Sequence, residues 1–177
     1  RLHQASRTAD ARALLALAGE VTSLPLARAV LELAPDTLDA PQRAALHERM
    51  AQAATTAAAR AALLDHAAAQ WWSAGERANA MAVARQALDA DGSQVRLAQV
   101  LCCAFEGGVL PPGELEALAQ RVDQGTAAVV GTMAARQGAV ASLPDVLVQL
   151  WATMPDAPAA ALQELARRAP LLPEAQQ

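Results

Sequence analysis

Apolar residues recur along most of the chain at spacings of three and four, which is the pattern of amphipathic helices. Gly and Pro interrupt this pattern at short intervals and divide the chain into about ten segments, each long enough for a helix. The longest predicted loop is 107–113, which contains three Gly and two Pro. We predict helices over residues 2–18, 23–34, 41–54, 57–73, 76–90, 94–106, 114–122, 126–137, 143–153 and 158–168.

The composition strengthens this prediction and argues against sheet folds. Ala occupies 48 of the 177 positions, aromatic residues make up 2% of the chain, and Ile and Tyr do not occur. Strands favour β-branched and aromatic side chains, whereas Ala, Leu, Arg, Glu and Gln are the strongest helix formers. The sequence therefore predicts an all-α fold, and the use of Arg without Lys suggests a bacterial source.

One segment of the sequence occurs twice. Residues 19–25 and 138–144 agree at five of seven positions, and each segment precedes an amphipathic helix that ends at Pro-Asp. A more diverged third copy begins at Gly75. Repetition of this kind favours stacked helix hairpins over a single bundle.

The repeated residues resemble the tetratricopeptide repeat, a hairpin of two antiparallel helices with Gly at the turn. In the central copy the matching residues are Leu64, Ala67, Ala68 and Trp71, then Gly75, then Ala80, Ala84, Ala87 and Leu88. In the last copy they are Ala127, Val130, Gly131 and Ala134, then Gly138, then Leu143, Leu147 and Leu150. The repeats are degenerate, because the turn glycines are 56 and 63 residues apart and the family period is about 34. The resemblance implies a right-handed α-solenoid; an irregular helical bundle is the alternative.

We predict one repeat domain over 1–177, in which Gly19, Gly75 and Gly138 form turns and Ala80 is buried. Its parts are a first hairpin (1–36), an extra helix or half repeat (37–56), three further hairpins (57–92, 93–124 and 125–156) and a capping helix with a tail (157–177). Three polar residues, Glu164, Arg167 and Arg168, end the capping helix. A pairing of 41–73 as one hairpin stays open.

The chain lacks the patterns of the common catalytic and ligand-binding sites. Without Lys it has no phosphate-binding P-loop, and His66 beside Asp65 does not face it on a helix. A disulfide between the neighbours Cys102 and Cys103 would be strained, and no helix carries a metal motif. A net charge of −4 argues against nucleic acid, and no apolar run is long enough to span a membrane. We predict no enzyme activity, metal or cofactor.

The resemblance implies a concave groove that binds a peptide or a partner domain. The groove positions carried over from the family are Asp65, Trp72, Arg96, Gln99, Cys103, Thr132 and Arg136. Arg96 and Arg136 suit an acidic or carboxylate-bearing partner, since Arg pairs with carboxylates through two hydrogen bonds. Trp72 suits an apolar anchor, whereas Trp71 and Trp151 are interpreted as packing residues.

The predicted function is a non-catalytic scaffold for protein–protein interaction. The alternative is a helical accessory domain of a larger bacterial enzyme or of a secretion or polysaccharide-export assembly, for example beside a glycosyltransferase. A small-molecule-binding bundle would require an enclosed apolar pocket. Because free thiols favour a reducing compartment, we expect a cytoplasmic location, with the periplasm as the alternative.

Overall fold

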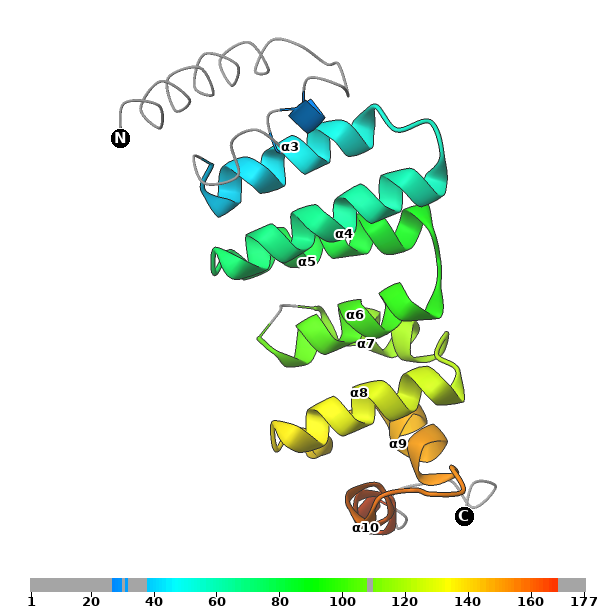
Figure 1. Cartoon of the computed structure of the whole chain (residues 1–177). Helices are drawn as coiled ribbons and strands as arrows, with labels where there is room; N and C mark the ends of the chain where they lie inside the picture. The colour runs from blue at the N-terminus through cyan, green and yellow to red at the C-terminus, as the bar shows by residue number, and fades with distance from the viewer. Residues whose placement is uncertain (1–26, 30, 32–37, 108–109, 169–177) are drawn as a thin grey trace. The chain divides into compact units, whose positions relative to one another are not determined.

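The computed structural model describes residues 27–29, 31, 38–107 and 110–168, and every regular element in these ranges is a helix (Figure 1). The elements are α3 (Ala40–Gln52), α4 (Ala57–Ser73), α5 (Arg77–Ala90), α6 (Gln94–Phe105), α7 (Pro112–Ala119), α8 (Gln124–Arg136), the 3-10 helix η1 (Val140–Ser142), α9 (Asp145–Ala152) and α10 (Ala159–Arg168). The predicted all-α class is confirmed for these residues, and the solenoid of hairpins stays a prediction.

The described residues cover the N-terminal predictions only in part. Residues 27–29 and 31 are helical, in agreement with the helix predicted over 23–34. The predicted helix over 2–18 and the predicted turn at Gly19 lie outside the described residues.

The chain divides into two compact units, Arg1–Gly92 and Ser93–Gln177, which we name the N-terminal and the C-terminal unit. Their boundary coincides with the predicted boundary between the hairpins 57–92 and 93–124. The single domain over 1–177 stays a prediction.

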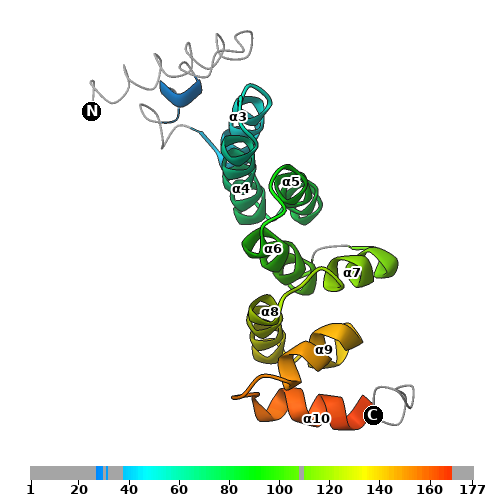
Figure 2. The ribbon, with the colours of Figure 1, turned by 90° about the vertical axis from the view of Figure 1, so that its right-hand side faces the viewer.

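In the N-terminal unit, α4 packs against both α3 and α5 (Figure 2). Both pairings that the sequence leaves open are therefore made. The buried faces of these helices are lined largely by Ala, and four of these residues have no exposed surface: Ala44, Ala61, Ala67 and Ala87. Side chains this small allow two packed helices to approach at the lower end of the usual distance between helix axes, which is about 8–10 Å. Ala80 is also buried, as predicted.

Local signals determine the bounds of α4. The Thr56 side chain accepts a hydrogen bond from the Ala59 backbone N–H (3.2 Å) and so caps the helix N-terminus. At the other end the Gly75 N–H donates to the Trp72 carbonyl, and the following N–H donates to the Trp71 carbonyl, both at 3.0 Å. This Schellman motif needs a positive φ at Gly75, which is +81°. The predicted turn at Gly75 is confirmed.

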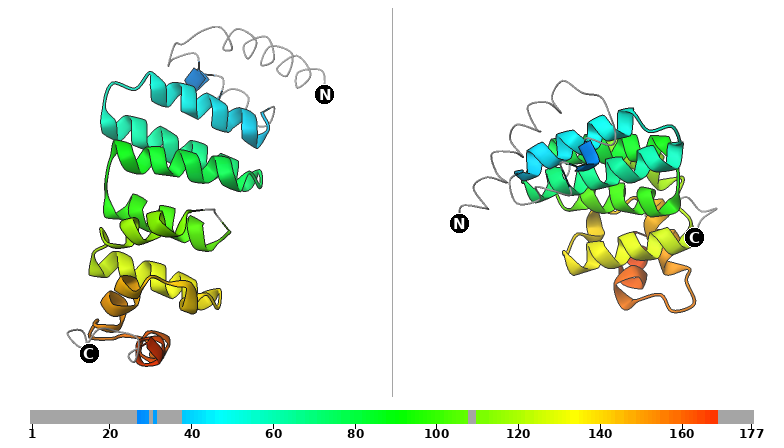
Figure 3. Two further views of the ribbon diagram at one scale, coloured as in Figure 1. Left: turned by 180° about the vertical axis from the view of Figure 1, so that it is seen from behind. Right: turned by 45° about the horizontal axis from the view of Figure 1, so that its top comes forward.

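In the C-terminal unit, α8 lies between α6 and α9, while α10 packs against α9 and η1 (Figure 3). Gly138 repeats the turn seen at Gly75: its φ is +68°, and its N–H donates to the Ala135 carbonyl (3.1 Å). The turn is confirmed, but the sequence did not predict η1. The last hairpin therefore has its second helix start at Asp145 rather than at Leu143.

The helices α4, α6 and α8 bury equivalent positions. Their buried faces contain Leu64, Ala67 and Ala68 in α4, Leu97, Val100 and Leu101 in α6, and Ala127, Val130 and Gly131 in α8. The three sets are related by shifts of 33 and 30 residues. We call this relation the shared register of α4, α6 and α8.

Gly131 is the position where α8 and α9 meet most closely. A Cβ atom built on Gly131 would lie 2.3 Å from Cδ2 of Trp151, which is 2% exposed. No side chain larger than hydrogen therefore fits unless the Trp151 side chain or α9 moves. This contact confirms that Gly131 is a position of close helix approach and that Trp151 is a packing residue.

The end of α10 differs from the solvent-facing polar cap that its sequence suggests. Glu164 and Arg168 are buried, whereas Arg167 is exposed. The Arg168 guanidinium donates to three carbonyls and two carboxylates: Leu143 O (2.7 Å), Ala141 O (2.9 Å), Val140 O (3.3 Å), Asp145 Oδ1 (2.6 Å) and Glu164 Oε1 (2.6 Å). Arg168 thus ties α10 to η1 and to the start of α9.

Candidate binding surface

The seven predicted groove residues are divided between the two units. Asp65 and Trp72 lie half-buried on α4, in the N-terminal unit. The other five lie on α6 and α8, which pack against each other: Arg96, Gln99 and Cys103 are half-buried, and Thr132 and Arg136 are exposed. The structure therefore places the five residues of the C-terminal unit on two helices that pack together.

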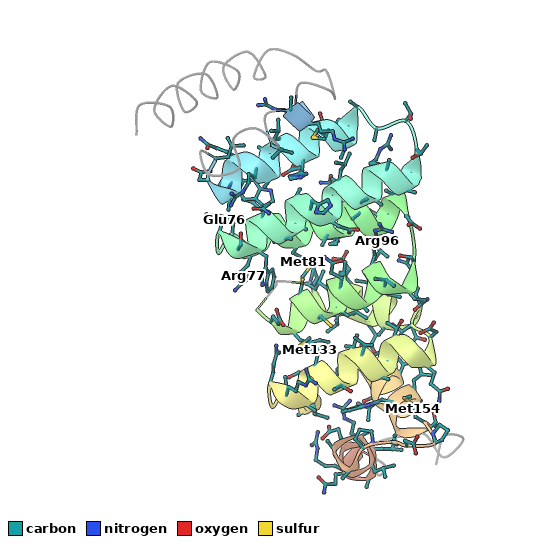
Figure 4. The ribbon with its side chains drawn as sticks, viewed as in Figure 1. Glu76, Arg77, Met81, Arg96, Met133 and Met154 are labelled. Atoms are coloured by element: carbon teal, nitrogen blue, oxygen red, sulfur yellow. The ribbon has the colours of Figure 1, made fainter. Side chains whose placement is uncertain are left out.

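The shared register shows that these five residues do not occupy one repeated face. Arg96 corresponds to Thr126, which is buried, and Cys103 corresponds to the half-buried Met133. Arg96 lies in the first turn of α6 and Met133 near the end of α8 (Figure 4). The Arg96 Nη1 donates to the Ser93 Oγ (3.3 Å), so this guanidinium takes part in the start of its own helix. Thr132 and Arg136, in contrast, are exposed, and the half-buried Gln99 is equivalent to the exposed Val129.

The exposed sides of α6 and α8 form the surface that we name the outward face. It consists of Val95, Ala98, Gln99 and Cys102 on α6 and Gly125, Val129, Thr132 and Arg136 on α8. Both helices run in the same direction (Figures 1 and 3) and bury the same register positions, so these residues share one side of the unit. Val95 is 78% exposed and Val129 is 57% exposed.

The two exposed valines are the residues that the sequence reasoning missed. Large apolar side chains this exposed are rare in the described residues, where Leu162 on α10 is the third, at 49%. The signal was present in the sequence, because Val95 lies two residues before Leu97 and Val129 two residues after Ala127. For Val129 the sequence already placed Ala127 among the repeat positions, whereas for Val95 the signal could be read only after Leu97 had been placed in the shared register.

The charges of the outward face lie at its ends, with Asp123 at the start of α8 and two further charges at the other end. Glu106 follows α6 and Arg136 ends α8, at equivalent register positions, and both are exposed. The rest of the face carries Val, Ala, Gly, Thr, Gln and Cys side chains. A surface with this composition suits an apolar partner surface with an ionic contact at one end.

The thiol on the outward face is a poor nucleophile. Burial raises the pKa of the Cys102 thiol, and the nearby Glu106 carboxylate raises it further. The reactive form of Cys is the thiolate, and the C-terminal unit contains no His that would act as a base. Cys102 and Cys103 form no disulfide. The outward face is therefore better suited to binding than to covalent chemistry.

In the N-terminal unit the two neighbouring tryptophans have different partners. The Trp71 indole Nε1 donates to a Glu48 carboxylate oxygen (2.6 Å), which links α4 to α3. The Arg77 guanidinium lies over the Trp72 ring, 3.7 Å from its centroid, and its Nη1 donates to the Trp72 carbonyl (3.3 Å). Figure 4 shows Arg77 beside Glu76, at the start of α5. Trp71 is half-buried rather than fully packed, and a face of Trp72 is covered by Arg77.

A pair of histidines also joins α3 to α4. The rings of His47 and His66 lie 5.4 Å apart between centroids, and the His47 Nδ1 is 2.8 Å from the Arg43 carbonyl. Burial lowers the pKa of His47, the Arg43 carbonyl raises it, and the charges of His66 and Arg43 lower it. The described residues contain no group of three or more His, Cys, Asp or Glu side chains that is arranged to hold a metal ion.

Among the described residues no helix is both long and apolar enough to cross a membrane. Comparison of the chain with protein-family models, with curated proteins and with solved structures finds no match. The outward face is therefore interpreted from its own residues.

Proposed function

We propose that this protein is a non-catalytic binding module that contacts a partner protein through the outward face of α6 and α8. The observation that carries the proposal is the exposure of Val95 and Val129 on one side of two packed helices. Water contact of such side chains is unfavourable by about 25 cal/mol for each Å² of apolar surface. Covering both valines therefore favours association, and the uncharged side chains between the ends of the face keep the cost of desolvation low.

The partner that suits this surface is an apolar segment, such as one side of a helix, with a carboxylate near one end. Arg136 is exposed at the end of α8 and has no ion-pair partner among the described residues, so it is available to such a carboxylate. Arg96, which binds Ser93, is the weaker candidate for this role. The proposal thus retains Arg136 from the sequence-based prediction that Arg96 and Arg136 bind an acidic or carboxylate-bearing partner.

Affinity capture with the full chain tests the proposal. Wild-type protein, Val95→Glu, Val129→Glu and Leu162→Glu are used as baits under the same conditions, and the captured proteins are identified by mass spectrometry. Leu162→Glu is the matched control, because it places the same charge on a comparably exposed apolar residue of α10. We expect one partner to be captured by wild type and by Leu162→Glu and to be lost with both valine variants.

The opposite pattern would contradict the proposal. If every partner is retained by Val95→Glu and Val129→Glu, the outward face is not the binding surface. Arg136→Ala extends the test to the charged end of the face, and a charge-assisted hydrogen bond there predicts binding weakened by about ten-fold or more. Circular dichroism of each variant checks that the helices are intact.

A further inference from the structure

The exposed side of α8 is complementary to itself when two copies run antiparallel. Asp123 caps the N-terminus of α8 and Arg136 ends the helix, so opposite charges mark its two ends. They are 13 residues apart, or about 20 Å along a helix. Val129 lies almost midway between them, and Gly125 and Thr132 lie on the same exposed stripe.

An antiparallel pair of α8 helices would therefore place Val129 of each copy near a two-fold axis. Asp123 of each copy would then lie at the level of Arg136 of the other, which gives two equivalent ion pairs that flank a valine contact. A two-fold contact uses the same patch on both subunits, and a patch whose charges are opposite about its centre satisfies this requirement. In a parallel pair, in contrast, like charges would meet at both ends.

The charges required for this contact are present at neutral pH. The Asp123 Oδ1 accepts a hydrogen bond from the Thr126 N–H at 2.7 Å, and this contact lowers the pKa of Asp123. No other acidic side chain among the described residues forms an ion pair with Arg136, and the side chains of Asp123 and Arg136 are both exposed. Small side chains at Gly125 and Thr132 leave room for a second helix beside Val129.

We infer that the chain self-associates through α8, with a second copy of this chain as the partner on that half of the outward face. The inference rests on the proposed function of the outward face and names one of its partners. A single helix pair is at the small end of specific interfaces, so the dimer is weak and depends on protein concentration. Val95, on α6, is left for a different partner.

Sedimentation equilibrium of the full chain from about 1 µM to about 1 mM measures the dimerisation constant over the range expected for weak association. Wild type is expected to show reversible monomer–dimer equilibrium. Arg136→Glu places two carboxylates together at each end, and Asp123→Arg places two guanidinium groups there, so each variant alone is expected to weaken dimerisation by about ten-fold or more. Val129→Glu is expected to weaken it similarly, and Leu162→Glu is expected to leave it unchanged.

The decisive sample is an equimolar mixture of Arg136→Glu and Asp123→Arg. A heterodimer of these variants regains both opposite-charge pairs, so the mixture is expected to associate at least about ten-fold more tightly than either variant alone. Loss of the Asp123 cap does not imitate this rescue, because the Asp123→Arg copies lack the cap in the mixture as well as alone. A monomeric wild type over the whole range, or a mixture no tighter than its components, would overturn the inference.

The same measurements separate this inference from the proposed function. If wild type is monomeric but a captured partner is lost with Val95→Glu and Val129→Glu, the second copy is excluded and the outward face still binds a protein. If wild type dimerises as expected and capture finds no other partner, self-association is supported and binding of a different protein is not.

Discussion

The hairpins α4–α5 and α8–α9 fill the same register positions with different side chains. Position 68 of α4 is Ala and its equivalent in α8 is Gly131; Leu88 of α5 corresponds to Trp151 of α9. All four residues are buried. At these two positions the N-terminal unit has a small and a medium-sized residue, Ala and Leu. The C-terminal unit has Gly, which has no side chain, and Trp, which has the largest one. A repeated backbone pattern therefore does not require repeated side chains, provided that facing volumes compensate.

The two units also differ on their exposed sides. In α4 the positions equivalent to Val95 and Val129 are Ala62 and His66, so the N-terminal unit has no exposed large apolar residue there. The shared register thus determines which residues are buried in both units. The two exposed valines on which the proposed function rests lie on the outward face of the C-terminal unit.

The largest change in the free energy of unfolding is expected for Gly131→Ala. The new Cβ would overlap Trp151, and we expect unfolding free energy to fall by about 3 kcal/mol, although Ala favours a helix over Gly by about 1 kcal/mol. Gly125→Ala in the same helix is the control, because its Cβ would meet Asp123 Oδ1 at an ordinary 3.6 Å. Urea unfolding should show destabilisation for the first and stabilisation for the second. Equal effects of the two substitutions would contradict the close contact between Gly131 and Trp151.

Ala80→Leu tests the packing of the N-terminal unit. Ala80 is 2% exposed, and three additional carbon atoms should overpack the site and destabilise it by about 1–3 kcal/mol. Ala82→Leu is the control, because Ala82 is exposed on the same helix. Thermal unfolding followed by circular dichroism measures both variants, and an unchanged melting temperature for Ala80→Leu would show that α5 is not closely packed there.

A smaller effect is expected from the contact between Glu164 and Arg168. Hydrogen bonds from Arg167 and Arg168 lower the pKa of Glu164 to about 2, with the Arg167 bond the larger cause and burial acting against them. A carboxylate with a lowered pKa stabilises the fold above its unfolded pKa, and this contribution is lost as pH falls from 4.5 towards 2. Glu164→Gln should cost about 1 kcal/mol at pH 7 and flatten the acid side of the stability profile. A profile identical to that of wild type would contradict the predicted contribution of Glu164.

The smallest effect is expected from His47. Its pKa is lowered, chiefly by burial, so the unfolded chain binds more protons than the folded chain just below pH 6.5. Stability should therefore be full above pH 6.5 and decrease as the pH falls below it. Chemical unfolding of wild type and His47→Gln is compared between about pH 5 and about pH 8, the range in which His changes its charge. The free energy of unfolding should decrease less steeply with falling pH in the variant. A decrease of the same slope in both proteins would assign the effect to another group.

Local signals made much of the fold predictable from the sequence. The helix over 57–73 was predicted with the bounds that the structure shows, since Thr56 and Gly75 determine its ends through neighbouring backbone groups. The role of Arg168 could not be predicted, because three of its acceptors are backbone carbonyls 25 to 28 residues earlier in the chain. Such contacts leave no spacing or motif in the sequence.

The candidate surface was predicted less well for a related reason. Thr132 and Arg136 belong to the outward face, but Arg96 and Cys103 were placed without knowledge of the register of α6. That register depends on the burial of Leu97, Val100 and Leu101, and the long loop after α6 obscured it in the sequence. An error of one residue on a helix rotates the exposed side by about 100°, so Val95 was missed. Val129 was missed although the sequence had already assigned Ala127 and Val130 to the buried side of its helix.

Binding of the captured partner to Val95→Glu and to Ala62→Glu tests the central claim most directly. The two variants place the same charge at equivalent positions of α6 and α4, both exposed and both tolerant of Glu in a helix. Isothermal titration should show wild-type affinity for Ala62→Glu and an affinity at least about ten-fold weaker for Val95→Glu. Equal affinities for the two variants would contradict the claim that the outward face of the C-terminal unit is the binding surface.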